Sequence, residues 1–247
     1  MRNLVKAEWL KIWNGRVWWI LSGFALLMCA MACAGFLAEA KKQLPRGQTT
    51  PEVVTTTLVN VWFMVELVAA LVAMIAVTRE FGNGAINRSV LLSGGRRRLQ
   101  VAKLIAATAA GAVFAAATGV LAAASPWVFL IGTGYRPAWT AETTWTLLGV
   151  MAVVVAGAVW GSALGLLIRN QVAAVVTMLL STWLVSESLF RLVPAVGKFT
   201  VDEAMAAVYH DVKPELLSPP VALAVLAGWL ALAAFAGGRQ FLHRDLP

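Results

Sequence analysis

The sequence predicts an all-α polytopic membrane protein with six transmembrane helices. Of its 247 residues, 60% are hydrophobic and only 13% are charged, whereas a soluble domain carries about a quarter charged residues. The hydrophobic residues form continuous runs close to the length of about 20 residues with which a helix crosses the hydrocarbon core. Strands of a membrane β-barrel would alternate apolar and polar residues instead. Because the runs use most of the chain, we expect residues 1–247 to form a single transmembrane domain.

The six expected spans differ in length and in the residues that interrupt them. The first is about 22 residues long, too long for the apolar core of a signal peptide, so we expect it to be retained. Its cysteines, Cys29 and Cys33, are expected to be packing residues rather than a disulfide or metal pair. The third span is long enough to tilt, or to break near Ser125 and Pro126. The expected spans cover residues 17–38, 57–78, 104–132, 145–168, 171–193 and 219–238.

The basic residues indicate which ends of the spans are cytoplasmic. If the N terminus is inside, thirteen of the 20 Lys and Arg residues flank the inner ends of the spans and seven flank the outer ends. Cytoplasmic segments of membrane proteins carry an excess of Lys and Arg, so we expect both termini to be cytoplasmic. Because these residues flank apolar runs rather than gather on a soluble module, we expect no nucleic-acid partner.

The N-terminal segment is expected to form an amphipathic interfacial helix over residues 2–14. Val5, Trp9, Ile12 and Trp13 share one helical face, and basic residues flank it. Such a helix lies in the headgroup region of the membrane, where tryptophan is favoured, so membrane lipid is an expected partner. The alternative is a basic lead-in that only fixes the topology.

The largest cytoplasmic feature is the loop at 79–103. Gly82 and Gly84 permit a turn, residues 85–92 can form a short helix, and Gly94–Gly95 would stop it. The arginines that follow agree with cytoplasmic topology, but topology alone does not explain a short helix framed by glycines.

The external loop at 194–218 is also too long for a simple turn. We expect a short helix over residues 201–212, lying at the outer surface. The sequence contains no G-x-x-x-x-G-K-[ST] motif and no cluster with metal-ligand spacing, and its histidines occur only at 210 and 243. We therefore expect no catalytic, cofactor-binding or metal-binding residue in this chain.

Two glutamates, Glu66 and Glu187, lie inside apolar runs. A carboxylate at the bilayer centre costs about 2.5–3.5 kcal/mol on insertion scales, so such acids usually face a partner, a cavity or a transport path. Both lie at similar depth from the outer boundary and could line one cavity. Glu187 precedes Arg191 by four residues, an order that also favours an intrahelical ion pair, and this alternative stays open.

Three glycines in the fourth span, Gly157, Gly161 and Gly165, form a double G-x-x-x-G pattern. Glycines four residues apart make a flat helix face that lets another backbone approach closely. We expect a helix-packing surface there, without knowing whether the neighbour belongs to the same chain.

The layout as a whole resembles a permease of the type 2 class of ATP-binding cassette (ABC) exporters. The local motif is Glu80-Phe81-Gly82-Asn83-Gly84-Ala85-Ile86, similar to the acid-x-x-x-Gly-Thr-aliphatic element of that family. Ala85 stands where threonine is commoner, and Gly95 stands where a proline often precedes the arginine.

The resemblance implies a non-catalytic subunit in a bacterial plasma membrane. Two permeases, identical or paralogous, would pair above two P-loop ATPase subunits that bind ATP and Mg, and would export an antibiotic, a peptide or a lipid-like amphiphile. Antibiotic resistance would be one such role. The second and fifth spans would line the path, with Glu66, Glu187, Trp62 and Trp183. The residues expected to couple to the ATPase are Glu80, Gly84, Ala85, Ile86, Arg88 and Leu91.

Two other functions remain open. One is a proton-coupled secondary transporter with Glu66 as the titrating group. The other is a membrane assembly or sensor subunit that transports nothing.

Overall fold

The computed structural model describes residues 1–213 and 215–243, and within these ranges the chain is helical, without strands. Six helices are long and apolar enough to cross a membrane, which confirms the predicted fold class. Some begin earlier than expected: the second starts at Pro51 and the third at Arg96. The candidate spans are Val17–Arg46, Pro51–Gly82, Arg96–Phe129, Ala141–Ile168, Gln171–Leu192 and Pro219–Leu242.

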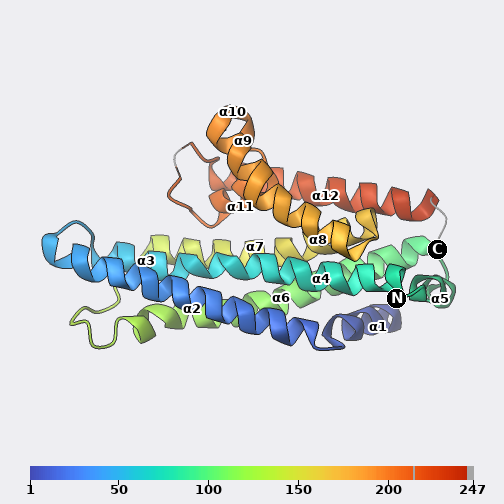
Figure 1. Cartoon of the computed structure of the whole chain (residues 1–247), viewed down its shortest axis with the longest axis horizontal. Helices are drawn as coiled ribbons and strands as arrows, with labels where there is room; N and C mark the ends of the chain where they lie inside the picture. The colour runs from blue at the N-terminus through green and yellow to red at the C-terminus, as the bar shows by residue number, and fades with distance from the viewer. Residues whose placement is uncertain (214, 244–247) are drawn as a thin grey trace.

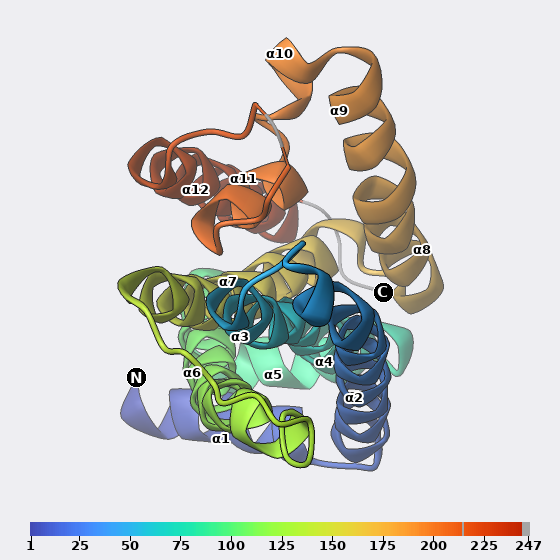
Figure 2. The same ribbon diagram turned by 90° about the vertical axis from the view of Figure 1, so that its left-hand side faces the viewer.

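Helices α4 and α7 form the centre of the bundle and make its most extensive contact. Figure 2 shows α1, α2 and α6 on one side of this pair and α8, α9 and α12 on the other. In Figure 1, α1 and α5 lie together at one end of the molecule, here called the α5 end, while α11 lies toward the opposite end. The bounds of these helices are α1 Arg2–Trp13, α2 Val17–Gln43, α3 Pro51–Asn60, α4 Val65–Gly82, α5 Ala85–Ser93, α6 Arg96–Phe129, α7 Ala141–Ile168, α8 Gln171–Leu180, α9 Glu187–Leu192, α10 Pro194–Gly197, α11 Val201–Val208 and α12 Pro219–His243.

The three glycines of the fourth span lie in α7 and face α4 of the same chain. A Cβ atom at Gly157 would lie 2.7 Å from the carbonyl oxygen of Glu66, and one at Gly165 would lie 3.1 Å from that of Met74. At Gly161 it would collide with the backbone of Ala70. Because a side chain at these positions would push the helices apart, the glycine face sets the close α4–α7 spacing.

The second and fifth spans are each interrupted midway. A 3₁₀ segment, η2 (Val61–Met64), separates α3 from α4, and a π-helical segment, η3 (Ser181–Ser186), separates α8 from α9. Each glutamate follows its interruption at once, Glu66 as the second residue of α4 and Glu187 as the first of α9. Such departures from α geometry inside a helix often accompany functional positions.

The third span does not break at Pro126, because α6 continues to Phe129. Proline has no N–H with which to bond the carbonyl four residues earlier, which here belongs to Ala122. The Ser125 hydroxyl lies 2.8 Å from that oxygen and donates to it, and it also lies 3.1 Å from the carbonyl of Leu58. The serine thus satisfies the carbonyl that the proline leaves free and allows the helix to continue.

Helix α11 differs from the expectation of a helix on the outer surface. Most of its residues are buried, and it packs against α12, α7 and η3. Its alanines, Ala204, Ala206 and Ala207, have small side chains, and the backbone of Val208 touches Gly149 of α7. Gly149 lies eight residues into α7, so the C-terminal end of α11 contacts that helix about 12 Å from its N-terminal end. The segment enters the bundle because small side chains allow backbones to approach.

Candidate functional site

Helix α5 lies at the α5 end between two glycine turns. Gly84 has φ 69° and Gly94 has φ 74°, in the left-handed region that glycine adopts without steric cost. The Asn83 side-chain oxygen accepts a hydrogen bond of 3.1 Å from the Ala85 N–H at the start of the helix. An isolated helix of this length is marginal in water, so α5 depends on its packing.

The packing anchor of α5 is Ile86, which is fully buried. It was predicted to belong to the ATPase-coupling surface, but its side chain points into the bundle and is not available to a partner. It lies in a small apolar cluster that joins α5 to α4, α6, α7 and α12, made of Val77, Phe81, Ile86, Leu99, Leu166 and Phe241.

The opposite face of α5 is exposed. Leu91 is 82% and Leu92 is 81% exposed, and Arg88 and Asn87 lie beside them one turn earlier. Of the residues predicted for coupling, Arg88 and Leu91 are therefore on this face, while Gly84 and Ala85 form the preceding turn. We call Asn87, Arg88, Leu91 and Leu92 the α5 face. Two adjacent exposed leucines on a helix whose other face is buried indicate a surface that binds a partner.

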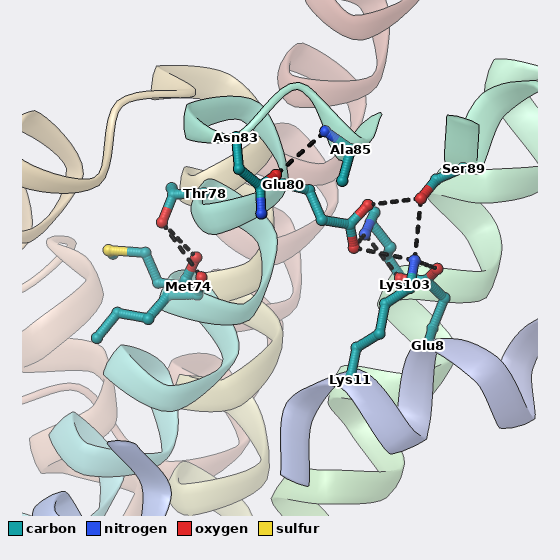
Figure 3. A network of polar contacts seen from close by, with 10 residues as sticks. Glu8, Lys11, Met74, Thr78, Glu80, Asn83, Ala85, Ser89 and Lys103 are labelled. Atoms are coloured by element: carbon teal, nitrogen blue, oxygen red, sulfur yellow. Dashed lines mark hydrogen bonds and ion pairs between the residues drawn. The ribbon is translucent and has the colours of Figure 1, made fainter. Parts of the chain in front are cut away.

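Behind α5, three buried charged side chains and the partly exposed Lys11 meet in a network, shown in Figure 3. The Lys103 Nζ atom of α6 lies 2.6 Å from Glu8 Oε2 of α1 and 2.6 Å from Glu80 Oε1 of α4. Lys11 Nζ of α1 contacts Glu8 and lies 3.1 Å from Glu80 Oε1. We call Glu8, Lys11, Glu80 and Lys103 the α5 ion cluster.

Ser89 connects α5 to this cluster. Its hydroxyl donates to Glu80 Oε2 over 2.9 Å, and its oxygen lies 3.1 Å from Lys11 Nζ. Glu80, which was predicted to lie in the coupling interface, is therefore buried behind α5 and holds that helix through Ser89. The cluster joins α1, α4, α5 and α6 through direct side-chain contacts (Figure 3).

The two lysines and two glutamates carry a formal net charge of zero. Ionised groups can be buried when they are paired in this way. The side chains of Glu8, Glu80 and Lys103 are only 4%, 9% and 3% exposed. Burial alone would lower the pKa of the Lys11 ammonium, but the hydrogen bond to Glu8 and the charge of Glu80 outweigh it and raise that pKa. Lys11 thus stays charged at neutral pH.

Sequence reasoning missed Glu8. The signal was present, because Glu8 is the single acid of a basic helix and precedes Ile12 by four residues, on the apolar face. An acid on the apolar face of an interfacial helix needs cationic partners, and Lys11 of the same helix and Lys103 of α6 supply them.

The residues predicted for a substrate path do not all lie together. Glu66 packs against Gly157, with its side chain between α4 and α7. Trp62, four residues earlier, is 6% exposed and lies beside α2 and α6 instead. The reason is the 3₁₀ segment: its three residues per turn rotate Trp62 away from the face that carries Glu66. Trp183, in η3, is 68% exposed.

Glu187 forms the predicted ion pair with Arg191, and its place in a substrate path stays a prediction. Glu187 Oε1 accepts from Arg191 Nε over 2.7 Å, and Glu187 Oε2 lies 2.9 Å from Lys213 Nζ. Lys213 also reaches Glu203 Oε1 of α11 over 2.9 Å. Glu187 is thus neutralised by two cations and does not offer an unpaired carboxylate to a cavity. We call Glu187, Arg191, Glu203 and Lys213 the α11 ion cluster.

Comparison with known proteins agrees with this architecture. The fold is that of a multi-pass α-helical membrane protein with one short helix exposed at its α5 end. A family model described as ABC-2 family transporter protein matches residues 4–185. The chain therefore belongs to the ABC-2 transporter family and is a transmembrane subunit of an ABC transporter. No curated protein shows significant similarity to it.

Proposed function

We propose that this chain is the substrate-path subunit of an ATP-driven exporter and that the α5 face binds a separate P-loop ATPase subunit. The observation that carries the proposal is the pair of exposed leucines, Leu91 and Leu92, on a helix that is fixed from behind. ATP and Mg would be bound by the partner and not by this chain.

The α5 ion cluster supplies a route from the ATPase to the membrane helices. A force on α5 reaches Glu80 of α4 through Ser89, and it reaches α1 and α6 through Lys11 and Lys103. Helix α4 in turn packs against the glycine face of α7. Because these elements are joined by buried contacts, movement of α5 would shift them together, and ATP binding would bias the transporter between two states.

The partner permease would pack near the fifth span. This span is the least buried of the six, with 17% of its apolar window covered by the chain. A second copy, or a paralogue, would cover it and place the two paths side by side, with two ATPase subunits below. In this assembly both termini and α5 are cytoplasmic, in a bacterial plasma membrane, and the substrate is an amphiphile such as an antibiotic, a peptide or a lipid.

The first test is co-purification in mild detergent. We expect a stoichiometric subunit with a P-loop to accompany the wild-type chain, and to be lost when Leu91 and Leu92 are both changed to serine. Burying one leucine contributes about 1.5–3 kcal/mol, so the double change should weaken the association by at least tenfold.

Val212→Ser is the control, because Val212 is 96% exposed and lies outside the candidate spans and α5. Equal retention of the ATPase by the Leu91/Leu92 double variant and by Val212→Ser would refute the docking site. A chain that purifies alone and moves solute in response to a proton gradient would instead favour secondary transport through Glu66.

A further inference from the structure

A cavity of about 410 Å³ lies at the α5 end, between the first turns of α6 and the last turns of α12. Arg96 holds these two segments together, because it donates hydrogen bonds to the carbonyl oxygens of Phe241 and Leu242 over 3.2 and 2.9 Å. One turn further along α6, Gln100 donates to the carbonyl oxygen of Ala234 over 2.8 Å. The walls of the cavity are therefore fixed by contacts within the chain, and none of them belongs to the α5 face or to either ion cluster.

Two arginines line this cavity, Arg97 from α6 and Arg239 from α12. Both side chains are exposed, and neither forms a hydrogen bond or an ion pair with another described residue. Among the residues that the structure describes, no acid lines the cavity. Two cations that face one cavity repel each other unless an anion lies between them. The cavity therefore has the charge of an anion site, and a ligand can reach both of its cationic side chains.

The position of Arg97 in its helix also requires an anion. Arg97 is the second residue of α6, and the first turn of that helix contains no acid. The N-terminus of a helix carries a partial positive charge, so a cation there is unfavourable without a counter-ion. A cytoplasmic location explains the sign of these charges, but it does not explain why two unpaired arginines from distant parts of the sequence line the same cavity.

The remaining wall of the cavity is apolar and lies at the depth of the lipid headgroups. Phe235 and Leu242 line it and are 66% and 41% exposed. From Pro219 to Gly238, α12 has no charged residue, and this stretch of about 20 residues spans about 30 Å, the thickness of the hydrocarbon core. Arg239 follows at once and therefore lies at the boundary where the phosphate groups of lipids begin. A ligand in the cavity meets cations at that boundary and an apolar wall on the hydrocarbon side.

We propose that this cavity binds an anionic glycerophospholipid from the leaflet at the α5 end, with the phosphate between Arg97 and Arg239 and an acyl chain along Phe235. Arginine suits this role because its planar guanidinium can donate two parallel hydrogen bonds to phosphate oxygens. The bound lipid neutralises the two cations and joins the start of α6 to the end of α12, both of which lie at the α5 end (Figure 1). This proposal does not depend on the ATPase or on transport.

The test compares phosphatidylglycerol, which is anionic, with zwitterionic phosphatidylcholine of the same acyl chains. The purified full chain is incubated with an equal mixture in mild detergent, and the bound lipids are identified by native mass spectrometry. An arginine near an anionic headgroup contributes about fivefold in affinity. With two arginines in the site, we expect phosphatidylglycerol to be retained at least tenfold over phosphatidylcholine.

Single substitutions then locate the site. Arg97→Gln and Arg239→Gln should each lower the preference for phosphatidylglycerol about fivefold, since each removes one cation from the cavity. Arg98→Gln is the matched control, because Arg98 is the next residue of α6 and is also exposed but does not line the cavity. It should leave the preference unchanged. Equal losses in Arg97→Gln and Arg98→Gln would mean that the basic surface attracts lipid diffusely, which would overturn the proposal.

Two other outcomes would assign the cavity to a different ligand. Displacement of phosphatidylglycerol by an equal concentration of glycerol phosphate would show that the cavity recognises phosphate without a lipid chain, against the proposal. Equal retention of both lipids by the wild-type chain, together with loss of a co-purifying ATPase subunit in Arg97→Gln, would show that an acidic segment of the partner occupies the cavity instead.

Discussion

The two ion clusters of this molecule use the same residue types in opposite ways. In the α5 ion cluster, Lys103 and its two glutamates are less than 10% exposed and come from three different helices, and only Lys11, at 36%, reaches the surface. In the α11 ion cluster only Glu203 is buried, at 3% exposed, whereas Lys213 and Glu187 are 32% and 33% exposed and Arg191 is 77% exposed. Lys213, moreover, lies outside any helix.

The difference in exposure predicts which end of the molecule can open locally. A buried, fully paired network is costly to open because each ion would be left in a low-dielectric region. Exposed pairs can exchange their partner for water at little cost. We infer that the α5 end moves as one unit, while the α11 end can separate from its neighbours locally.

The largest effect is expected from Lys103→Met. It leaves Glu8 and Glu80 buried without their shared cation, and breaking a buried pair costs about 3–5 kcal/mol. The midpoint of thermal unfolding in mild detergent should fall markedly. Lys42→Met is the control: this lysine is 68% exposed and pairs with Glu39 at 3.5 Å, so its loss should cost less than about 1 kcal/mol. Similar midpoints for the two variants would contradict the comparison.

A smaller effect is expected from Lys213→Met, about 1–3 kcal/mol, because Glu203 is 3% exposed and loses its cation while Lys213 itself is partly exposed. Burial raises the pKa of Glu203, so this carboxyl can take up a proton more readily once Lys213 is gone. The expected result is faster amide hydrogen exchange in α11 with no change in α5. Lys198→Met serves as the control, because Lys198 forms no ion pair among the described residues and lies over the Phe199 ring. Faster exchange in both helices would mean that the two ends are not independent.

The smallest effect on hydrogen exchange is expected from an increase in salt concentration. Raising the ionic strength from about 0.1 to 1 M shortens the screening length from about 10 to 3 Å, which weakens exposed ion pairs more than buried ones. Hydrogen exchange of α11 should increase slightly and that of α5 should not change. A salt response of α5 equal to that of α11 would show that water reaches the α5 ion cluster.

Composition and length were enough to predict the spans, because the bilayer imposes them on any chain. The glycine face of α7 and the short helix at α5 were also visible, since both depend on local residue spacing. What spacing could not reveal was the partner: the α7 glycines face Glu66, Ala70 and Met74, which lie far earlier in the chain.

The missed features depend on contacts between distant segments. Trp62 was placed with Glu66 because both lie in the second span, and the 3₁₀ segment turns their side chains to different faces. Helix α11 was placed on the surface because it lies in a long external loop, yet the backbone at its C-terminal end packs against Gly149. Ile86 was assigned to the interface as part of a motif, although an aliphatic residue next to a turn is as suitable for an anchor.

The pairing of Glu8 with Lys103 has a consequence for biosynthesis. The two residues are 95 positions apart in the sequence. At a synthesis rate of about 5–20 residues per second, Lys103 is added roughly 5–20 s after Glu8. During that interval Glu8 has only Lys11 of its own helix as a cation, so we expect it to stay at the wet membrane surface. We therefore expect the N-terminal helix to reach its final position only after the third span has been inserted.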